Sequence, residues 1–492
     1  MSIKALTFFA LACIFSFTAC QPKNQGTVDF SDPELSGKIE SLADSIFSEK
    51  ALFGDFIFAV VNENGLVYSF ALNLDIQAGK PTTLNNNSPI YIASHTKSFT
   101  GTMMKILEEQ NKLSLDSSLA FYIPELVFDN RMDTKNINVK ALLNHTHGTF
   151  STRLTWKTAF LGYQGENDEL INDFNKDFQL DTSHVFRYSN VGPIVSSMIV
   201  DRTCERSWKD VMKREIFDPL EMTNTSAYVT DFAFDQIRPS VLGTTELGIV
   251  EEDFYKTDVT MHASGGVIST VNDLSRWLSA NIRQDDKLMK KSSWADLHQS
   301  TTAQDRRYFT YHRSGYSLGW DIAEYQNKRI LTRFGGLAGI SFHISFMPEH
   351  QIGIIALSTD NRASLLPHLI ANYAYNHINN QNADSIFQIE YSKFDEYFEK
   401  VNNEQYPKQE GLLKKDDSNK LIAGIYQNSL DWPDIKISQE QDHYQFEWGV
   451  LNGKVYRKDE HQYLASLGVL IRNFEVRNDT LLTGSLIYLK KD

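Results

Sequence analysis

Ser94 and Lys97 are the residues whose types and spacing point most directly to chemistry, because they form the only Ser-x-x-Lys tetrapeptide in the chain. A serine nucleophile needs a base within hydrogen-bonding distance and donors aimed at the developing oxyanion. The segment 89–93 before Ser94 is strand-like, and apolar residues after it recur at helical spacing, namely Phe99, Met103 and Leu107. The spacing predicts a helix that begins at Ser94, with Lys97 one turn later on the same face.

The N-terminus of a helix carries a positive potential, which favours negative charge on Ser94 and disfavours protonation of Lys97. A free lysine titrates near about 10.4, so burial and this potential must lower its pKa before it can accept a proton at neutral pH. The alternative for the same residues is a surface lysine beside a capping serine.

Ser317 is the competing nucleophile, because residues 315–319 match the Gly-x-Ser-x-Gly pattern. That pattern forms a nucleophile elbow only where a helix directly follows the serine. The segment 320–325 alternates like a strand instead. We therefore expect Ser317 to be structural.

Tyr188 and Asn190 form a Tyr-x-Asn triplet, and Tyr325 and Tyr426 begin two others. Only the triplet at Tyr188 is followed by a helix-like apolar segment, at 191–200. The His-x-His pattern at 145–147 is a poor metal site, since no carboxylate–histidine pair follows it. We expect a structural turn there, and neither a metal nor an organic cofactor.

Several segments resemble, in order, the serine β-lactamase family, and its class C branch above all. Segment 92–100 resembles the active-site motif, 142–148 the H-T-S-G segment and 187–192 the Y-x-N segment. Further similar segments are 216–222, 265–270 and 316–320. The family includes class C β-lactamases, D-alanyl-D-alanine carboxypeptidases, D-aminopeptidases and esterases, and the resemblance spans residues 34–385.

The resemblance implies that Ser94, Lys97 and Tyr188 are catalytic. Ser94 would attack a carbonyl and form an acyl-enzyme, which water then releases. Tyr188 would exchange a proton with Ser94 and later with the leaving group, and phenolate character there would need two nearby cations or donors, of which Lys97 is one. Asn190 would orient the substrate or Lys97.

The family's third motif, K-T-G or H-x-G, is replaced here by Arg333 followed by Phe334, Gly335, Gly336 and Leu337, and we expect the last four to contact substrate. The oxyanion donors would be the backbone N–H groups of Ser94 and Leu337. We place Phe334 at the polar or basic position and turn Arg333 away, because neighbours on a strand face opposite ways. This favours esters, neutral amides or aminopeptidase-like substrates over carboxylate-bearing ones. The alternative is an inactive or catalytically weak lipoprotein that binds cell-wall peptides.

Composition excludes several other classes of function. The 492 residues include 48 Lys and Arg against 62 Asp and Glu, a net charge of −14, so we expect no nucleic-acid partner. Three cysteines exclude a disulfide scaffold and a multi-cysteine zinc site.

Residues 1–20 resemble a lipoprotein signal peptide, with Lys4, an apolar run at 5–17 and small residues before Cys20. We expect Cys20 to be lipidated and residues 21–33 to form a tether, which would anchor the protein in the bacterial cell envelope, on the periplasmic face of the outer membrane. The alternative is an ordinary secretory signal.

The order of helical and strand signals predicts an α+β body at 34–385: an antiparallel sheet flanked by helices, with a helical subdomain between the Ser94 and Tyr188 motifs and beyond. The charged stretch 386–419 is interpreted as a linker. Short alternating runs at 420–492 predict a small antiparallel β domain. The sequence leaves the oligomeric state open.

Overall fold

The computed structural model describes residues 30, 32–73, 84–128, 131–238, 240–244, 248–252, 256–337, 339–403, 411–414, 422–468 and 470–491. Cys20, the segment 1–20 and most of the expected tether at 21–33 lie outside these residues. Within the described part of the chain, no helix is both long and apolar enough to span a membrane.

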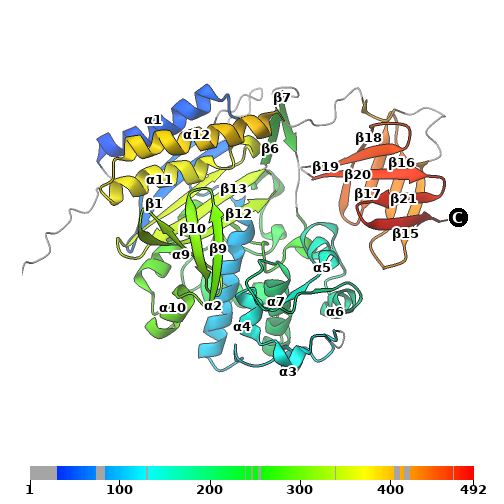
Figure 1. Ribbon diagram of the computed structural model, residues 1–492, viewed down its shortest axis with the longest axis horizontal. Coiled ribbons are helices and arrows are strands. Elements are labelled where there is room, and N and C mark those ends of the chain that lie inside the picture. The colour runs from blue at the N-terminus through cyan, green and yellow to red at the C-terminus, as the bar shows by residue number, and fades with distance from the viewer. Residues whose placement is uncertain are drawn as a thin grey trace, which may run out of the picture.

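An eight-stranded antiparallel sheet forms the centre of the body, in the order β2-β1-β14-β13-β12-β11-β10-β9 (Figure 1). The strands are β1 (Asp55–Asn62), β2 (Gly65–Asn73), β9 (Thr302–Tyr308), β10 (Tyr311–Tyr316), β11 (Asp321–Tyr325), β12 (Lys328–Leu337), β13 (Ile340–Met347) and β14 (Ile352–Ser358). Strands β9 to β14 form a meander, and β1 closes onto β14 from the other end of the chain. This pairing confirms the expected α+β class.

Helices cover both faces of the sheet, so each face has its own apolar core. One face packs against α1 (Pro33–Glu49), α11 (Leu366–Ile378) and α12 (Ala383–Asn402). The other packs against α9 (Val271–Arg283), with α2 (Thr96–Glu109) and α10 (Lys291–His298) behind it. Local capping explains some of the helix starts: Asp32 accepts from the N–H of Glu34 ahead of Pro33, and Thr270 accepts from that of Asp273.

A helical lobe extends the second core beyond the sheet. It contains α3 (Leu119–Tyr122), α4 (Val139–Leu143), α5 (Thr152–Trp156), a π-helical turn (Lys157–Leu161), α6 (Asn167–Lys176), α7 (Val191–Cys204), α8 (Trp208–Met212) and a second π-helical turn (Lys213–Phe217). Within the described residues, the body also has three two-stranded ladders, which pair β3 (Ile90–Tyr91) with β8 (Ile268–Ser269), β4 (Thr149–Phe150) with β5 (Gln179–Leu180), and β6 (Ser240–Thr244) with β7 (Gly248–Glu252).

The C-terminal β domain is a closed eight-stranded antiparallel barrel (Figure 1). Its strands are β15 (Gly424–Asn428), β16 (Ile435–Gln439), β17 (Tyr444–Trp448), β18 (Leu451–Arg457), β19 (Gln462–Leu467), β20 (Leu470–Arg477), β21 (Thr480–Thr483) and β22 (Leu486–Lys490). The barrel docks on the helical lobe: Leu161 belongs to the barrel's apolar core, and its carbonyl accepts from the N–H of Val450 at 2.8 Å.

The structure corrects the linker expected at 386–419. Helix α12 continues to Asn402, and three of its aromatic side chains are buried in the core that it shares with α11, namely Phe387, Phe394 and Phe398. The body therefore extends beyond residue 385. Many charged residues in this stretch lie on the exposed side of the helix, which hides its apolar spacing in the composition.

Candidate active site

Ser94 lies at the start of a helix, as its sequence context predicted. It is the middle residue of a 3₁₀ turn (Ala93–His95) that leads directly into α2. The preceding Ala93 has φ of +47°, a left-handed backbone conformation that is uncommon for a residue with a side chain. This sharp entry follows the short ladder of β3 with β8 and leaves Ser94 half-buried at the foot of the helix.

Lys97 is fully enclosed one turn later, with a relative exposure of 2%. Its Nζ lies 3.1 Å from Ser94 Oγ, 2.8 Å from Asn190 Oδ1 and 2.8 Å from the carbonyl oxygen of Ser264. Burial, with the positive charge of Arg333 as a second cause, lowers the pKa of Lys97 well below its usual value. A neutral amine has two N–H donors and one lone pair, so it can donate to Asn190 and Ser264 while it accepts from the hydroxyl of Ser94.

Tyr188 lies beside Lys97 and Arg333. Lys97 Nζ lies 4.7 Å and the Arg333 guanidinium 4.9 Å from its ring centroid, so an amine and a permanent cation are near the phenol. Burial nevertheless outweighs the effect of Arg333 and raises the pKa of Tyr188. The phenolate considered from the sequence is therefore disfavoured, and Tyr188 holds its proton as a phenol.

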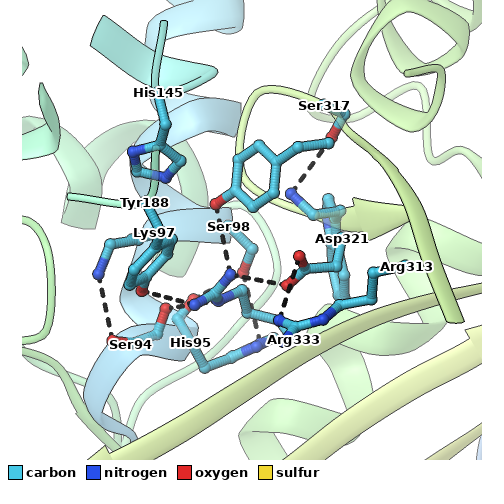
Figure 2. A network of polar contacts seen from close by, with 12 residues as sticks. Ser94, His95, Lys97, Ser98, His145, Tyr188, Arg313, Ser317, Asp321 and Arg333 are labelled. Carbon is cyan, nitrogen blue, oxygen red and sulfur yellow. Dashed lines mark hydrogen bonds and ion pairs between the residues drawn. The ribbon is translucent and has the colours of Figure 1, made fainter. Parts of the chain in front are cut away.

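Arg333 connects these groups, as Figure 2 shows. Its Nη2 donates to the hydroxyl oxygen of Tyr188 at 2.6 Å, and its Nε donates to the carbonyl oxygen of Ser94 at 3.1 Å. Its Nη1 donates to Asp321 Oδ2 at 2.9 Å and lies 3.4 Å from the hydroxyl of Tyr316. Four of the five N–H groups of a guanidinium are thus engaged inside the protein.

The expected orientation of Arg333 and Phe334 is wrong. Phe334 lies on the opposite face of β12, where it stacks on Tyr308 with ring centroids 4.3 Å apart and packs 5.2 Å from His343. Alternation along the strand then turns Arg333 toward Ser94. Phe334 is a core residue next to α11 rather than a substrate contact, and the basic position of the third motif is occupied by Arg333.

The three residues after Phe334 form the end of β12 that lies near the Ser94 segment. Gly335 is packed so closely that a Cβ there would lie 2.4 Å from the carbonyl oxygen of Ile92, which requires glycine. Gly336 is exposed with nothing within 4 Å of a Cβ, and Leu337 packs against the core of the helical lobe.

The register of β12 also identifies which N–H faces the site. Tyr325 and Lys328 flank a two-residue hairpin turn whose central residues have φ of +50° and +59°. The backbone N–H of Lys328 therefore points toward β11. Even-numbered residues of β12 then direct their N–H groups toward β11, which pairs only as far as Thr332. The N–H of Gly336 points past the end of β11, whereas that of Leu337 points toward β13. The register therefore directs the N–H of Gly336, and not that of Leu337 as expected, toward the site.

Asn190 lies between Lys97 and the loop at 261–267. Its Oδ1 accepts from Lys97 at 2.8 Å and from Ser264 Oγ at 2.7 Å. Of the two roles considered from the sequence, the structure supports the orientation of Lys97. Ser264 was missed, because a serine whose carbonyl acts has no side-chain signal in a sequence.

The two histidines of the His-x-His turn are buried. His145 has φ of +63°, accepts from the N–H of Ser189 at 3.3 Å, and packs its ring 4.8 Å from that of Tyr188. His147 Nδ1 lies 2.8 Å from Thr149 Oγ1, two residues further along the chain. These contacts support a structural turn that positions Tyr188, and the described residues contain no cluster of three or more His, Cys, Asp or Glu able to hold a metal.

Ser317 is fully buried in a turn, where its Oγ accepts from the N–H of Trp320 at 3.2 Å. Strand β11 follows it directly, so the helix that a nucleophile elbow requires is absent at this position. Ser317 is structural.

Comparisons with known proteins agree with this geometry. A profile of the Beta-lactamase family matches residues 49–373. Among curated proteins, the chain is 24% identical over 297 residues to Protein flp of Staphylococcus aureus (strain COL), covering 59% of this chain and 55% of that protein. It is 20% identical over 291 residues to the Unguisins hydrolase ungD' of Aspergillus campestris, covering 58% and 54%. The chain spans about half the length of these relatives.

Solved structures show the same fold. The octameric penicillin-binding protein homologue of Pyrococcus abyssi superposes with a TM-score of 0.63 at 18% identity, covering 92% of this chain and 100% of that one. The D-amino acid amidase of Ochrobactrum anthropi superposes with a TM-score of 0.56 at 17% identity, covering 66% and 91%. With the family profile matched over most of the body and the Ser94–Lys97–Tyr188 constellation at the foot of α2, the chain belongs to the Beta-lactamase family.

Proposed function

We propose that the protein is a serine hydrolase that cleaves an uncharged ester or amide through an acyl-enzyme. One observation carries the proposal: Ser94 Oγ lies 3.1 Å from the Nζ of a buried lysine whose other two contacts are acceptors. That environment suits the neutral amine, which is the form able to take the serine proton.

The steps follow from these contacts. Lys97 accepts the proton of Ser94 as Oγ forms a bond to the substrate carbonyl carbon. The N–H groups of Ser94 and Gly336 stabilise the oxyanion. The leaving group departs with the proton of Tyr188, and the ammonium of Lys97 returns a proton to Tyr188. In deacylation Lys97 deprotonates a water, whose oxygen bonds the acyl carbon. The bond to Ser94 Oγ then breaks, and the ammonium of Lys97 returns the proton to Ser94.

The engagement of Arg333 supports an uncharged substrate. Most of its donors bond Asp321, Tyr188, Tyr316 and Ser94, which leaves little of the guanidinium for a substrate carboxylate. The name of one structural relative, a D-amino acid amidase, also points to amide bonds.

Labelling with a fluorophosphonate tests the nucleophile. We expect an adduct that is lost in Ser94→Ala and kept in Ser317→Ala. Loss in Ser317→Ala alone, with the fold retained, would make Ser317 the nucleophile. An adduct on Ser94 without turnover of any ester or amide would favour the binding protein over the hydrolase.

Comparison of substrates tests the specificity. We expect hydrolysis of a small neutral activated ester, and slow or no turnover of penicillins or D-Ala-D-Ala peptides. Turnover of a cephalosporin at a typical enzyme rate of about 10 per second would contradict the preference for uncharged substrates.

We also propose that Cys20 carries lipid and anchors the protein to the bacterial cell envelope, at the periplasmic face of the outer membrane. The motif before Cys20 supports it. Cys20→Ser should move the protein from the membrane fraction to the soluble fraction, because acyl chains supply the anchor. Retention of the variant in membranes would show that residues 5–17 remain as the tether.

A further inference from the structure

Asp321 is buried at the start of β11, with a side chain 2% exposed. Its Oδ2 accepts from Arg333 Nη1 at 2.9 Å. Its Oδ1 accepts from Gln304 Nε2 at 2.9 Å and lies 3.4 Å from Arg313 Nη1. The carboxylate is therefore held by β9, β10 and β12 together, and it lies between Arg333 and Arg313 in Figure 2.

Arg333 connects Asp321 to Tyr188, because its guanidinium contacts both side chains. A guanidinium only donates hydrogen bonds, so the oxygen of Tyr188 must accept from Arg333 Nη2 across their 2.6 Å contact. The hydroxyl hydrogen of Tyr188 then has to point at another acceptor. The Oγ of Ser94 is such an acceptor, and its contact with Tyr188 is one of the causes that lower the pKa of the phenol, although burial outweighs it.

We propose that Asp321 is a positioning residue of this site: it fixes the guanidinium of Arg333, whose Nη2 donates to the oxygen of Tyr188, so that the hydroxyl hydrogen of Tyr188 is directed at the oxygen of Ser94 or of the leaving group, and its carboxylate offsets part of the positive charge beside Tyr188 and Lys97. Asp321 transfers no proton itself. The inference rests on the proposed hydrolase function and assigns Asp321 a place in it.

The charged groups around Tyr188 and Lys97 determine in which direction the pKa values of these two residues should change when Asp321 is replaced. Tyr188 is faced by Lys97 of α2, Arg333 of β12, Asp321 of β11, Arg313 and Tyr316 of β10, and His145 after α4. Burial keeps His145 and Tyr316 neutral, since it lowers the pKa of His145 and raises that of Tyr316.

Among the charged neighbours, Asp321 raises the pKa of Tyr188, whereas Arg333 and Arg313 lower it; burial remains the largest cause. For Lys97, burial and Arg333 lower the pKa and Asp321 raises it. Removing the charge of Asp321 should therefore lower the pKa of both catalytic groups.

Asp321→Asn tests this, because it removes the charge and keeps the shape. We would measure kcat/KM for a neutral ester between pH 5 and 10.5 in the full chain. Both the acid limb, from Lys97, and the alkaline limb, from Tyr188, should move to lower pH by roughly one unit, as expected for the loss of one nearby charge in a protein interior.

Arg313→Gln is the matched variant with the opposite sign. It removes the second guanidinium that contacts Asp321, and this cation lowers the pKa of Tyr188. The alkaline limb should therefore move to higher pH. If Asp321→Asn does not fold by circular dichroism, Arg313→Gln decides alone: an upward shift supports the inference and no shift overturns it.

A folded Asp321→Asn protein that loses rate but keeps both limbs in place would overturn the inference, because a merely structural role changes kcat without moving either pKa. Failure of the proposed function would appear elsewhere, as absence of labelling at Ser94 in the unmutated protein.

Discussion

Lys97 illustrates, at the scale of single residues, how burial sets the chemistry of the site. The lowered pKa of Lys97 makes it neutral at a pH where an ordinary lysine is charged, and activity should fall as pH drops and the amine becomes protonated. Lys97→Ala should reduce kcat/KM by at least about 10² and remove the acid limb of the profile. Steady-state kinetics from pH 5 to 9 on a neutral ester would measure both. A variant with near-unchanged rates would show that another group is the base.

Glycines decide, at the scale of elements, how closely α2 approaches the turn before β11. A Cβ on Gly101 would lie 1.6 Å from the carbonyl oxygen of Leu318, whereas one on Gly37 in α1 would meet nothing within 4 Å. Gly101→Ala should destabilise the protein by several kcal/mol, roughly the cost of overpacking. Gly37→Ala should stabilise it by up to about 1 kcal/mol, the helix-propensity difference. Urea unfolding of the pair would contradict this account if both variants moved in one direction.

Lys256 is a buried lysine that connects the π-helical turn at Lys157–Leu161 to the segment around Thr260. It is 2% exposed, and its Nζ donates to the carbonyl oxygens of Ala159 at 2.8 Å and Thr260 at 3.1 Å. Burial lowers its pKa to about 7. An unfolded lysine titrates near about 10.4, so between these values the unfolded chain binds a proton that the folded chain does not. The free energy of unfolding therefore rises with pH across this window, and the gain is lost as pH falls toward 7.

Lys256→Met should remove this dependence. We expect the slope of its unfolding free energy between pH 7.5 and 9.5 to be smaller than that of the unmutated protein, by up to about 1.4 kcal/mol per pH unit. Urea titrations at several pH values measure the slope. Lys287→Met, at an exposed lysine, is the control and should leave the slope unchanged. Equal slopes for all three proteins would mean that Lys256 stays charged in the fold.

The docking of the barrel matters at the scale of the whole molecule. Trp156 of α5 lies 5.5 Å from Trp448 of the barrel, ring centroid to ring centroid, and Leu161 is 1% exposed within the barrel core. A chain that ends after Asn403 keeps α12 but uncovers these side chains. We expect it to label with a fluorophosphonate, to melt at a lower temperature and to bind a hydrophobic dye.

Lys176→Ala provides the control for this truncation. It removes only the exposed ion pair with Asp431 between the two domains, which should change stability by less than about 1 kcal/mol. A truncated chain with an unchanged melting temperature would contradict a stabilising interface.

Local sequence brought Ser94 and Lys97 together. They lie three residues apart at a helix start, and this spacing places both side chains on one face of the helix, within contact distance of each other. The structural roles of Ser317 and of the His145 turn were also predictable, because each depends on the residues directly beside it.

Tertiary structure alone decided which side of β12 meets the site. Strand alternation separates Arg333 from Phe334 but does not say which one faces Ser94; the packing of Gly335 against Ile92 decides it. Lys97 and Ser264 are 167 residues apart, and Leu161 joins a barrel that begins more than 200 residues later. Contacts over such separations depend on how the sheet, the helical lobe and the barrel pack, and residue spacing in the sequence does not predict that packing.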